Sequence, residues 1–168
     1  QAHAIHAYEV DMLVDMNRER LAASIVYQQM APGIHRRWMD HYLARALDVA
    51  DPVRMVQEID TLLVEQPDEP ILHYYRIRFL MKLQQQDLVA QAMEKLVKLS
   101  PDSPRSLMLQ ARVAMDQLKL NQARQLFEKL AARGGASRQA AELYLPGLTA
   151  AGSSSKLTGS TQLQEVSQ

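Results

Sequence analysis

One stretch of the chain is repeated at a fixed spacing, and this period constrains the fold more than any other feature. Two stretches begin Pro-Asp-x-Pro: PDEPILHYYRIRFLMK, from Pro67, and PDSPRSLMLQARVAMD, from Pro101. Their starts lie 34 residues apart, and this spacing is the period. When residues 67–100 are aligned with residues 101–134, nine positions are identical. A fixed period of this length is the signature of stacked supersecondary units, which bury their apolar faces against one another.

The same period extends toward the N-terminus and defines four units. When the units are aligned one below another, small or apolar residues recur at the same position in three columns. The first column is Ala46, Leu80 and Ala114; the second is Ile25, Ile59, Met93 and Phe127; the third is Leu62, Leu96 and Leu130. We therefore predict four helix–turn–helix units near residues 1–33, 34–66, 67–100 and 101–134. The first unit fits more loosely, with Met12, Leu21 and Ile25 in register.

Residues typical of helix ends mark the units. A proline suits the first helical position, and an Asp or Asn before a helix can cap its free N–H groups. The predicted helix starts of this kind are Asp51-Pro52, Pro70, Asp87, Pro104 and Asn121. Gly134-Gly135 is predicted to end the last repeat helix, because glycine accepts the left-handed conformation found there.

The apolar residues follow helical spacing, as in Met55, Ile59 and Leu62, and no useful strand alternation is seen. The predicted fold class is therefore all-α. Residues 136–145 are predicted to form a short helix, stopped by Pro146-Gly147, that covers the end of the last repeat. The repeats and this helix make one predicted domain, 1–147, and the Gly/Ser/Thr-rich residues 148–168 are predicted to be a flexible polar tail.

These residues resemble the tetratricopeptide repeat family, whose unit is a helix–turn–helix of about 34 residues. Ala111, Ala114 and Ala123 match its small positions, Phe127 its large position, and Pro101 its closing proline. His73 and Leu107 depart from the pattern, because they stand where the family has an aromatic residue early in the first helix. The resemblance implies a right-handed α-solenoid of about four repeats that acts as a bacterial-type scaffold or adaptor.

The resemblance also implies a concave groove lined by the first helix of each unit. The groove positions taken as partner-binding residues are Arg37, Tyr74, Arg78, Met81, Lys82, Arg105, Met108, Arg112 and Met115. Further second-unit positions are Asp40, Ala44 and Leu47, and Asp40 and Ala44 stand where a chaperone-type carboxylate clamp would need Lys and Asn. Arg binds carboxylates in pairs of hydrogen bonds, and Met adapts to apolar side chains. The expected ligand is a protein segment with acidic and apolar groups; the alternative is that these Arg residues only solvate the helices.

Composition argues against several other functions. Lys plus Arg and Asp plus Glu each total 19, and a chain without net charge is a poor candidate for binding nucleic acid. There is no cysteine, and no motif of a hydrolase or a phosphate-binding loop is present. His3 and His6 are close in the sequence but lack the further ligands of a zinc site. We therefore expect no enzyme activity, no metal, no cofactor and no direct membrane insertion.

Two other interpretations stay open at this point. The chain could be a self-association module that forms a homodimer, or the regulatory repeat domain of a larger enzyme or sensor. It begins at Gln1 rather than Met, so we expect an excised or processed chain. Similarity to bacterial scaffolds suggests a role in envelope, pilus or secretion assembly, in the periplasm or the cytoplasm, and this placement is an analogy.

Overall fold

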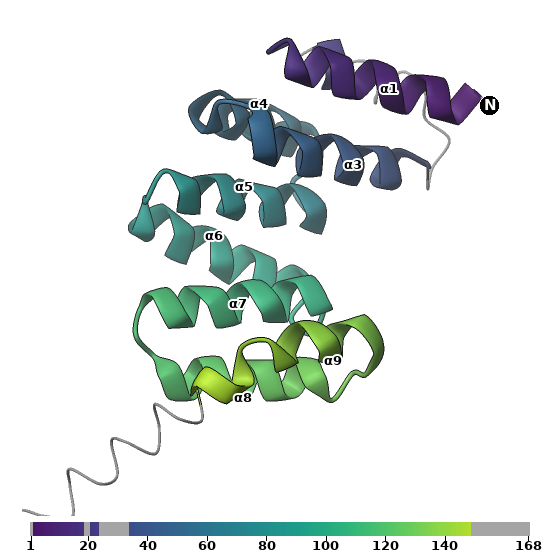
Figure 1. The fold of residues 1–168 in the computed structure, drawn as a ribbon. Coiled ribbons are helices and arrows are strands. Elements are labelled where there is room, and N and C mark those ends of the chain that lie inside the picture. The colour runs from purple at the N-terminus through teal and green to yellow at the C-terminus, as the bar shows by residue number, and fades with distance from the viewer. Residues whose placement is uncertain (1, 19–20, 24–33, 149–168) are drawn as a thin grey trace, which may run out of the picture. The chain divides into compact units, whose positions relative to one another are not determined.

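The computed structural model describes residues 2–18, 21–23 and 34–148, and the described residues contain helices and no strand. The all-α prediction is therefore confirmed. The helices are α1 (Ala2–Asp15), α3 (Ile34–Val49), α4 (Pro52–Glu65), α5 (Pro70–Lys82), α6 (Gln86–Leu99), α7 (Pro104–Asp116), α8 (Leu120–Ala131) and α9 (Gly135–Glu142) (Figure 1). The predictions for Ile25, for the side chains of His3 and His6, and for the tail from Thr149 fall outside the described residues and side chains.

The chain divides into two compact units, Gln1–Leu99 and Ser100–Gln168. In the first, α3 packs beside both α1 and α5, while α4 and α6 each pack against α5. Its core is built around fully buried large side chains, among them Tyr42, Leu43, Ile59, Leu72 and Phe79. Because α5 contacts α3, α4 and α6, it is the central helix of this unit.

The second unit contains α7, α8 and α9. Helix α8 packs against both of the others, around a core that includes Ala111, Ala114 and Phe127. The ring of Phe127 stacks on that of Tyr144, with 4.7 Å between centroids. The predicted helix 136–145 instead ends at Glu142, and a further helical turn at residues 145–148 buries Leu148. Pro146 is tolerated there because it lies in a first helical turn.

The sequence period is also present in the backbone. Helices α4, α6 and α8 begin at Pro52, Gln86 and Leu120, which have the same spacing as Pro67 and Pro101. Gln84 and Leu118, one period apart, have left-handed φ angles of 57° and 58°. In both turns the next residue donates its N–H to a carbonyl of the preceding helix, from Gln85 to Leu80 and from Lys119 to Ala114. These are Schellman turns, which end a helix by satisfying its free carbonyl groups.

The two Pro-Asp-x-Pro corners begin helices as predicted. Pro70 and Pro104 occupy the first helical positions, and the capping side chains are those of Glu69 and Ser103. Asp68 instead forms an ion pair with Lys95 on α6, at 2.7 Å. The hydrogen bond from Lys95 holds the pKa of this carboxyl below its usual range. The corner thus connects the start of α5 to α6.

The other predicted caps are partly correct. The side chain of Asp51 accepts the N–H of Val53 at the start of α4, as expected. Asp87 and Asn121 do not cap, because α6 and α8 begin before them, directly after the Schellman turns. Asp87 lies in the first turn of α6, where its negative charge still favours the positive end of the helix dipole.

The three predicted columns of core residues are confirmed wherever the structure describes them. Each of these side chains is at most 8% exposed, as seen for Ala46, Leu80 and Ala114, for Ile59, Met93 and Phe127, and for Leu62, Leu96 and Leu130. The first unit differs, because Met12 and Leu21 are 43% and 46% exposed. Among the α1 residues whose burial the structure describes, Val10 and Val14 are the buried ones, so the predicted register of Met12 and Leu21 is wrong.

The left-handed residue Leu118 generates a test of the repeated turn. Its side chain is 82% exposed, so replacing it removes little packing. Leu118→Gly should raise the free energy of unfolding by about 1 kcal/mol, because glycine adopts a positive φ without steric cost. The matched control, Gln122→Gly on the exposed side of α8, should lower it by about 1 kcal/mol. Urea unfolding of both variants measures the difference, and equal destabilisation by both would contradict the turn.

Candidate functional site

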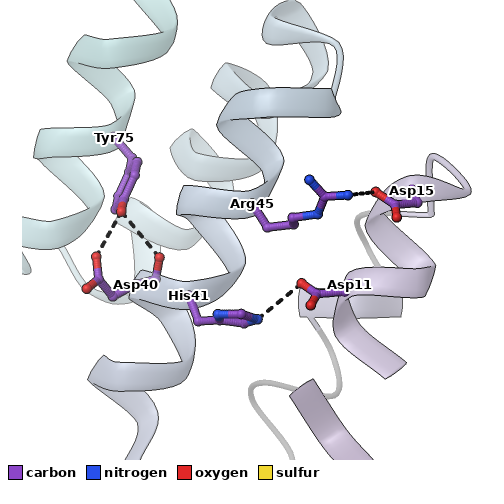
Figure 2. A network of polar contacts seen from close by, with 6 residues as sticks. All are labelled: Asp11, Asp15, Asp40, His41, Arg45 and Tyr75. Carbon is purple, nitrogen blue, oxygen red and sulfur yellow. Dashed lines mark hydrogen bonds and ion pairs between the residues drawn. The ribbon is translucent and has the colours of Figure 1, made fainter. Parts of the chain in front are cut away.

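The candidate site is the surface formed by α3 and α5 in the first unit. Helix α3 lies between α1 and α5 and forms polar contacts with both (Figure 2). Toward α1, the Nε2 atom of His41 lies 3.1 Å from a carboxylate oxygen of Asp11, and Arg45 donates to Asp15 at 2.6 Å. The two residues on each helix are one helical turn apart, so both pairs lie along one line.

On its other side, α3 forms at least three polar contacts with α5 and with the residue that caps it. The hydroxyl of Tyr75 donates to Asp40, 2.8 Å from a carboxylate oxygen and 3.3 Å from the backbone carbonyl oxygen (Figure 2). Arg36 forms an ion pair with Glu69 at 3.0 Å, and Lys82 donates to the carbonyl of Leu47. Tyr75 is 5% exposed, so its bond to Asp40 is the most shielded of the three. These contacts hold the two first helices side by side.

Next to these contacts, Tyr74 and Arg78 form a pair on α5. Arg78 donates to the Tyr74 hydroxyl at 2.9 Å, and its guanidinium carbon lies 5.8 Å from the centre of the same ring. The Tyr74 ring packs edge-on against Tyr75, with 5.0 Å between centroids. Both members of the pair are half-buried. The tyrosine therefore orients an arginine that is still reachable from solvent, with further N–H groups that can bind an acceptor.

The predicted α5 residues differ in how open they are. Met81 is half-buried, whereas Lys82 is exposed along its side chain even though its ammonium group binds the Leu47 carbonyl. On α3, Arg37 is exposed and makes no hydrogen bond or ion pair with the residues the structure describes. Arg37, Tyr74, Arg78, Met81 and Lys82 thus all lie on the two helices of the site and reach solvent to some degree.

Two further predicted groove positions on α3 differ from the expectation, since Leu47 is buried and the half-buried Asp40 is turned toward α5. Leu47 is 6% exposed, and Asp40 is bonded to Tyr75. The physical reason is the α3–α4 connection, residues 50–51, which is one residue shorter than the α5–α6 connection, residues 83–85. One residue rotates a helix by about 100°, so a strictly constant period misplaces the face of α3.

The shorter connection identifies site residues that the sequence analysis missed. His41 precedes Tyr74, and Arg45 precedes Arg78, by one residue less than a full period. Because the α3–α4 connection is one residue shorter, His41 corresponds to Tyr74 in the fold and Arg45 corresponds to Arg78. The ring of Trp38 packs edge-on against His41, with 6.1 Å between centroids, and also contacts the unit's core. The short Ala50-Asp51-Pro52 link was the signal in the sequence that could have revealed this shift.

In the second unit, the predicted residues lie on α7. Arg105 and Arg112 are exposed, while Met108 and Met115 are half-buried and pack against the core of that unit. The two methionines therefore have a structural role beside any binding role. The two arginines are separated by about two helical turns and project from one side of the helix.

No family model matches the chain, and neither the curated proteins nor the solved structures that were searched gave a match. The tetratricopeptide resemblance therefore stays a prediction. Within the described part of the chain, no three His, Cys, Asp or Glu side chains are grouped as a metal site would require. The described helices include none with the length and apolar character needed to cross a bilayer.

The Tyr75–Asp40 bond generates a test of how α5 is held beside α3. Tyr75→Phe leaves the Asp40 carboxylate without its shielded donor and should lower the free energy of unfolding by about 1 to 2 kcal/mol. Tyr8→Phe is the matched control, because Tyr8 is 73% exposed on α1 and should change stability very little. Urea unfolding compares the two, and an equally small effect of both substitutions would contradict a stabilising role for the bond.

Proposed function

We propose that this chain is a right-handed, tetratricopeptide-like solenoid that acts as a protein-binding adaptor. The repeated backbone geometry supports the proposal, since second helices begin once per period and two Schellman turns recur at the same interval. The side-by-side packing of α1, α3 and α5 also supports it, because first helices pack in this way when repeats stack. The proposed function needs no catalytic group.

The observation that carries the proposal is the Tyr74–Arg78 pair. An arginine fixed by a hydrogen bond and by the face of an aromatic ring loses less conformational freedom when it binds a carboxylate. Met81 lies about one helical turn further along α5 and offers an adaptable apolar contact. Arg37 and Lys82 add positive charge on the same two helices. The surface therefore suits a protein segment that carries an acidic side chain close to an apolar one.

The fourth repeat carries a similar pattern. Arg112 and Met115 stand one period after Arg78 and Met81, and Arg105 and Met108 lie on the same helix. Each set of residues lies within its own compact unit. These residues are the part of the proposed adaptor that selects an acidic and apolar partner over a basic one.

Charge reversal of Arg78 tests the proposal. The protein, immobilised by one terminus, is used to capture partners from an extract, and the captured proteins are identified by mass spectrometry. Arg78→Glu should reduce the recovery of specific partners at least about tenfold, since it replaces an attraction for a carboxylate with a repulsion. Arg78→Lys should keep part of the recovery, because it keeps the charge and loses the paired geometry.

Lys98→Glu is the matched control for this experiment. Lys98 is exposed on α6, so its reversal changes the net charge equally without touching the α3 and α5 surface. Circular dichroism confirms that each variant keeps its helices. Capture that survives Arg78→Glu, or that falls equally with Lys98→Glu, would show that this surface does not select the partner.

A further inference from the structure

A pocket lies elsewhere in the first unit, over α4, α5 and α6. It is an open depression of about 300 Å³, lined by Asp60, Leu63, His73, Arg76, Gln91, Ala92 and Lys95. This volume is at the lower end of the range for pockets that hold small molecules. None of the lining residues belongs to the surface assigned above to partner binding, so the site is independent of the proposed function.

The base of the depression is mostly apolar. Ala92 and His73 are 6% and 8% exposed, and Leu63 is half-buried against the core of the unit. The Nε2 atom of His73 lies 2.7 Å from the carbonyl oxygen of Pro67, so this nitrogen carries the proton and donates to the carbonyl. The histidine is thereby fixed in place at the corner that begins α5.

The rim holds more hydrogen-bond donors than acceptors. Arg76 uses its Nε–H on a carboxylate oxygen of Asp60, at 2.6 Å, and its terminal nitrogens form no hydrogen bond with the described residues. Lys95 donates one of its three N–H groups to Asp68, at 2.7 Å. The Arg76 side chain is only 23% exposed, and its ion pair with Asp60 holds it beside the depression. The two aspartates fix both cations and leave several donors unused.

We propose that this depression binds the terminal carboxylate of a peptide or of an acylated amino acid. The carboxylate lies between the terminal nitrogens of Arg76 and the ammonium group of Lys95, which together give it charged hydrogen bonds. The adjoining apolar side chain of the ligand packs on Leu63 and Ala92. Gln91 offers an amide to the peptide group that precedes the carboxylate. Asp60 takes only the Nε–H of Arg76, but its negative charge repels that of the ligand and so limits the affinity.

The test uses two probes of nearly equal size that differ in the terminal group, N-acetyl-L-leucine with its carboxylate and the uncharged N-acetyl-L-leucinamide. Each is titrated into the complete chain at fixed pH and ionic strength, and binding is followed by ¹H–¹⁵N NMR. The acid should bind with a dissociation constant on the order of 1 mM and shift the signals of Arg76, Gln91 and Lys95. The amide should bind at least about tenfold more weakly, because it lacks the charge.

Three variants and one control locate the binding. Arg76→Met and Lys95→Met should each weaken binding of the acid about tenfold. Asp60→Asn should tighten it, since the repelling charge is removed while the amide oxygen can still accept the Nε–H of Arg76, and this gain cannot arise from damage to the fold. Lys98→Met, one turn beyond Lys95 on α6 and outside the depression, should leave the affinity unchanged.

Several results would overturn the proposal. These are equal affinity for the acid and the amide, unchanged affinity in Arg76→Met, and weaker binding in Asp60→Asn. Inorganic phosphate serves as a third probe, and phosphate that binds more tightly than N-acetyl-L-leucine would contradict the assignment to a carboxylate with an apolar neighbour. Circular dichroism of each variant excludes loss of the helical fold as the cause of weaker binding.

Discussion

The rest of the structure depends on how the chain turns between the first and second helices of a repeat. In two repeats a three-residue connection with one left-handed residue, Gln84 or Leu118, closes a Schellman turn. This turn satisfies the carbonyl groups at the helix end and fixes how far the next helix is rotated. Because an α-helix turns by a fixed angle with each residue, the length of the connection decides which side chains point inward.

The α3–α4 connection shows the consequence of changing that length by one residue. With residues 50–51 only, Leu47 is buried and Asp40 meets Tyr75, while His41 and Arg45 meet the two aspartates of α1. Helix α3 thus connects its neighbours through the side chains of Arg36, Asp40, His41 and Arg45. On α5, with the longer connection, Arg78 is instead held by Tyr74 within its own helix. The terminal N–H groups of Arg78 that Tyr74 does not use therefore stay available to an acceptor from solvent.

The sequence predicted features that depend on local chemistry or on the average period. Pro70 and Pro104 begin their helices, Asp51 caps α4, and the columns that include Ile59 and Leu96 are buried, because each of these needs only a helix and an apolar neighbour. The candidate site on α3 could not be predicted in this way. Its orientation depends on one missing residue, which a comparison at a constant spacing averages out. The repeat also does not predict which charged residues form ion pairs. Asp68 and Lys95 recur one period later as Asp102 and Lys129, yet among the described residues only the first two form an ion pair. This is expected for exposed pairs, because they contribute little to stability.

The measurement that tests this account most directly is the rate at which single cysteines on α3 react with a maleimide. The chain has no cysteine of its own, so each introduced thiol reports on one position. If the short connection rotates α3 as described, the thiol of Leu47→Cys is protected in the folded protein and reacts far more slowly than that of Ala44→Cys, which is exposed. Equal rates at the two positions under native conditions would contradict the rotation, and with it the assignment of the α3 and α5 surface.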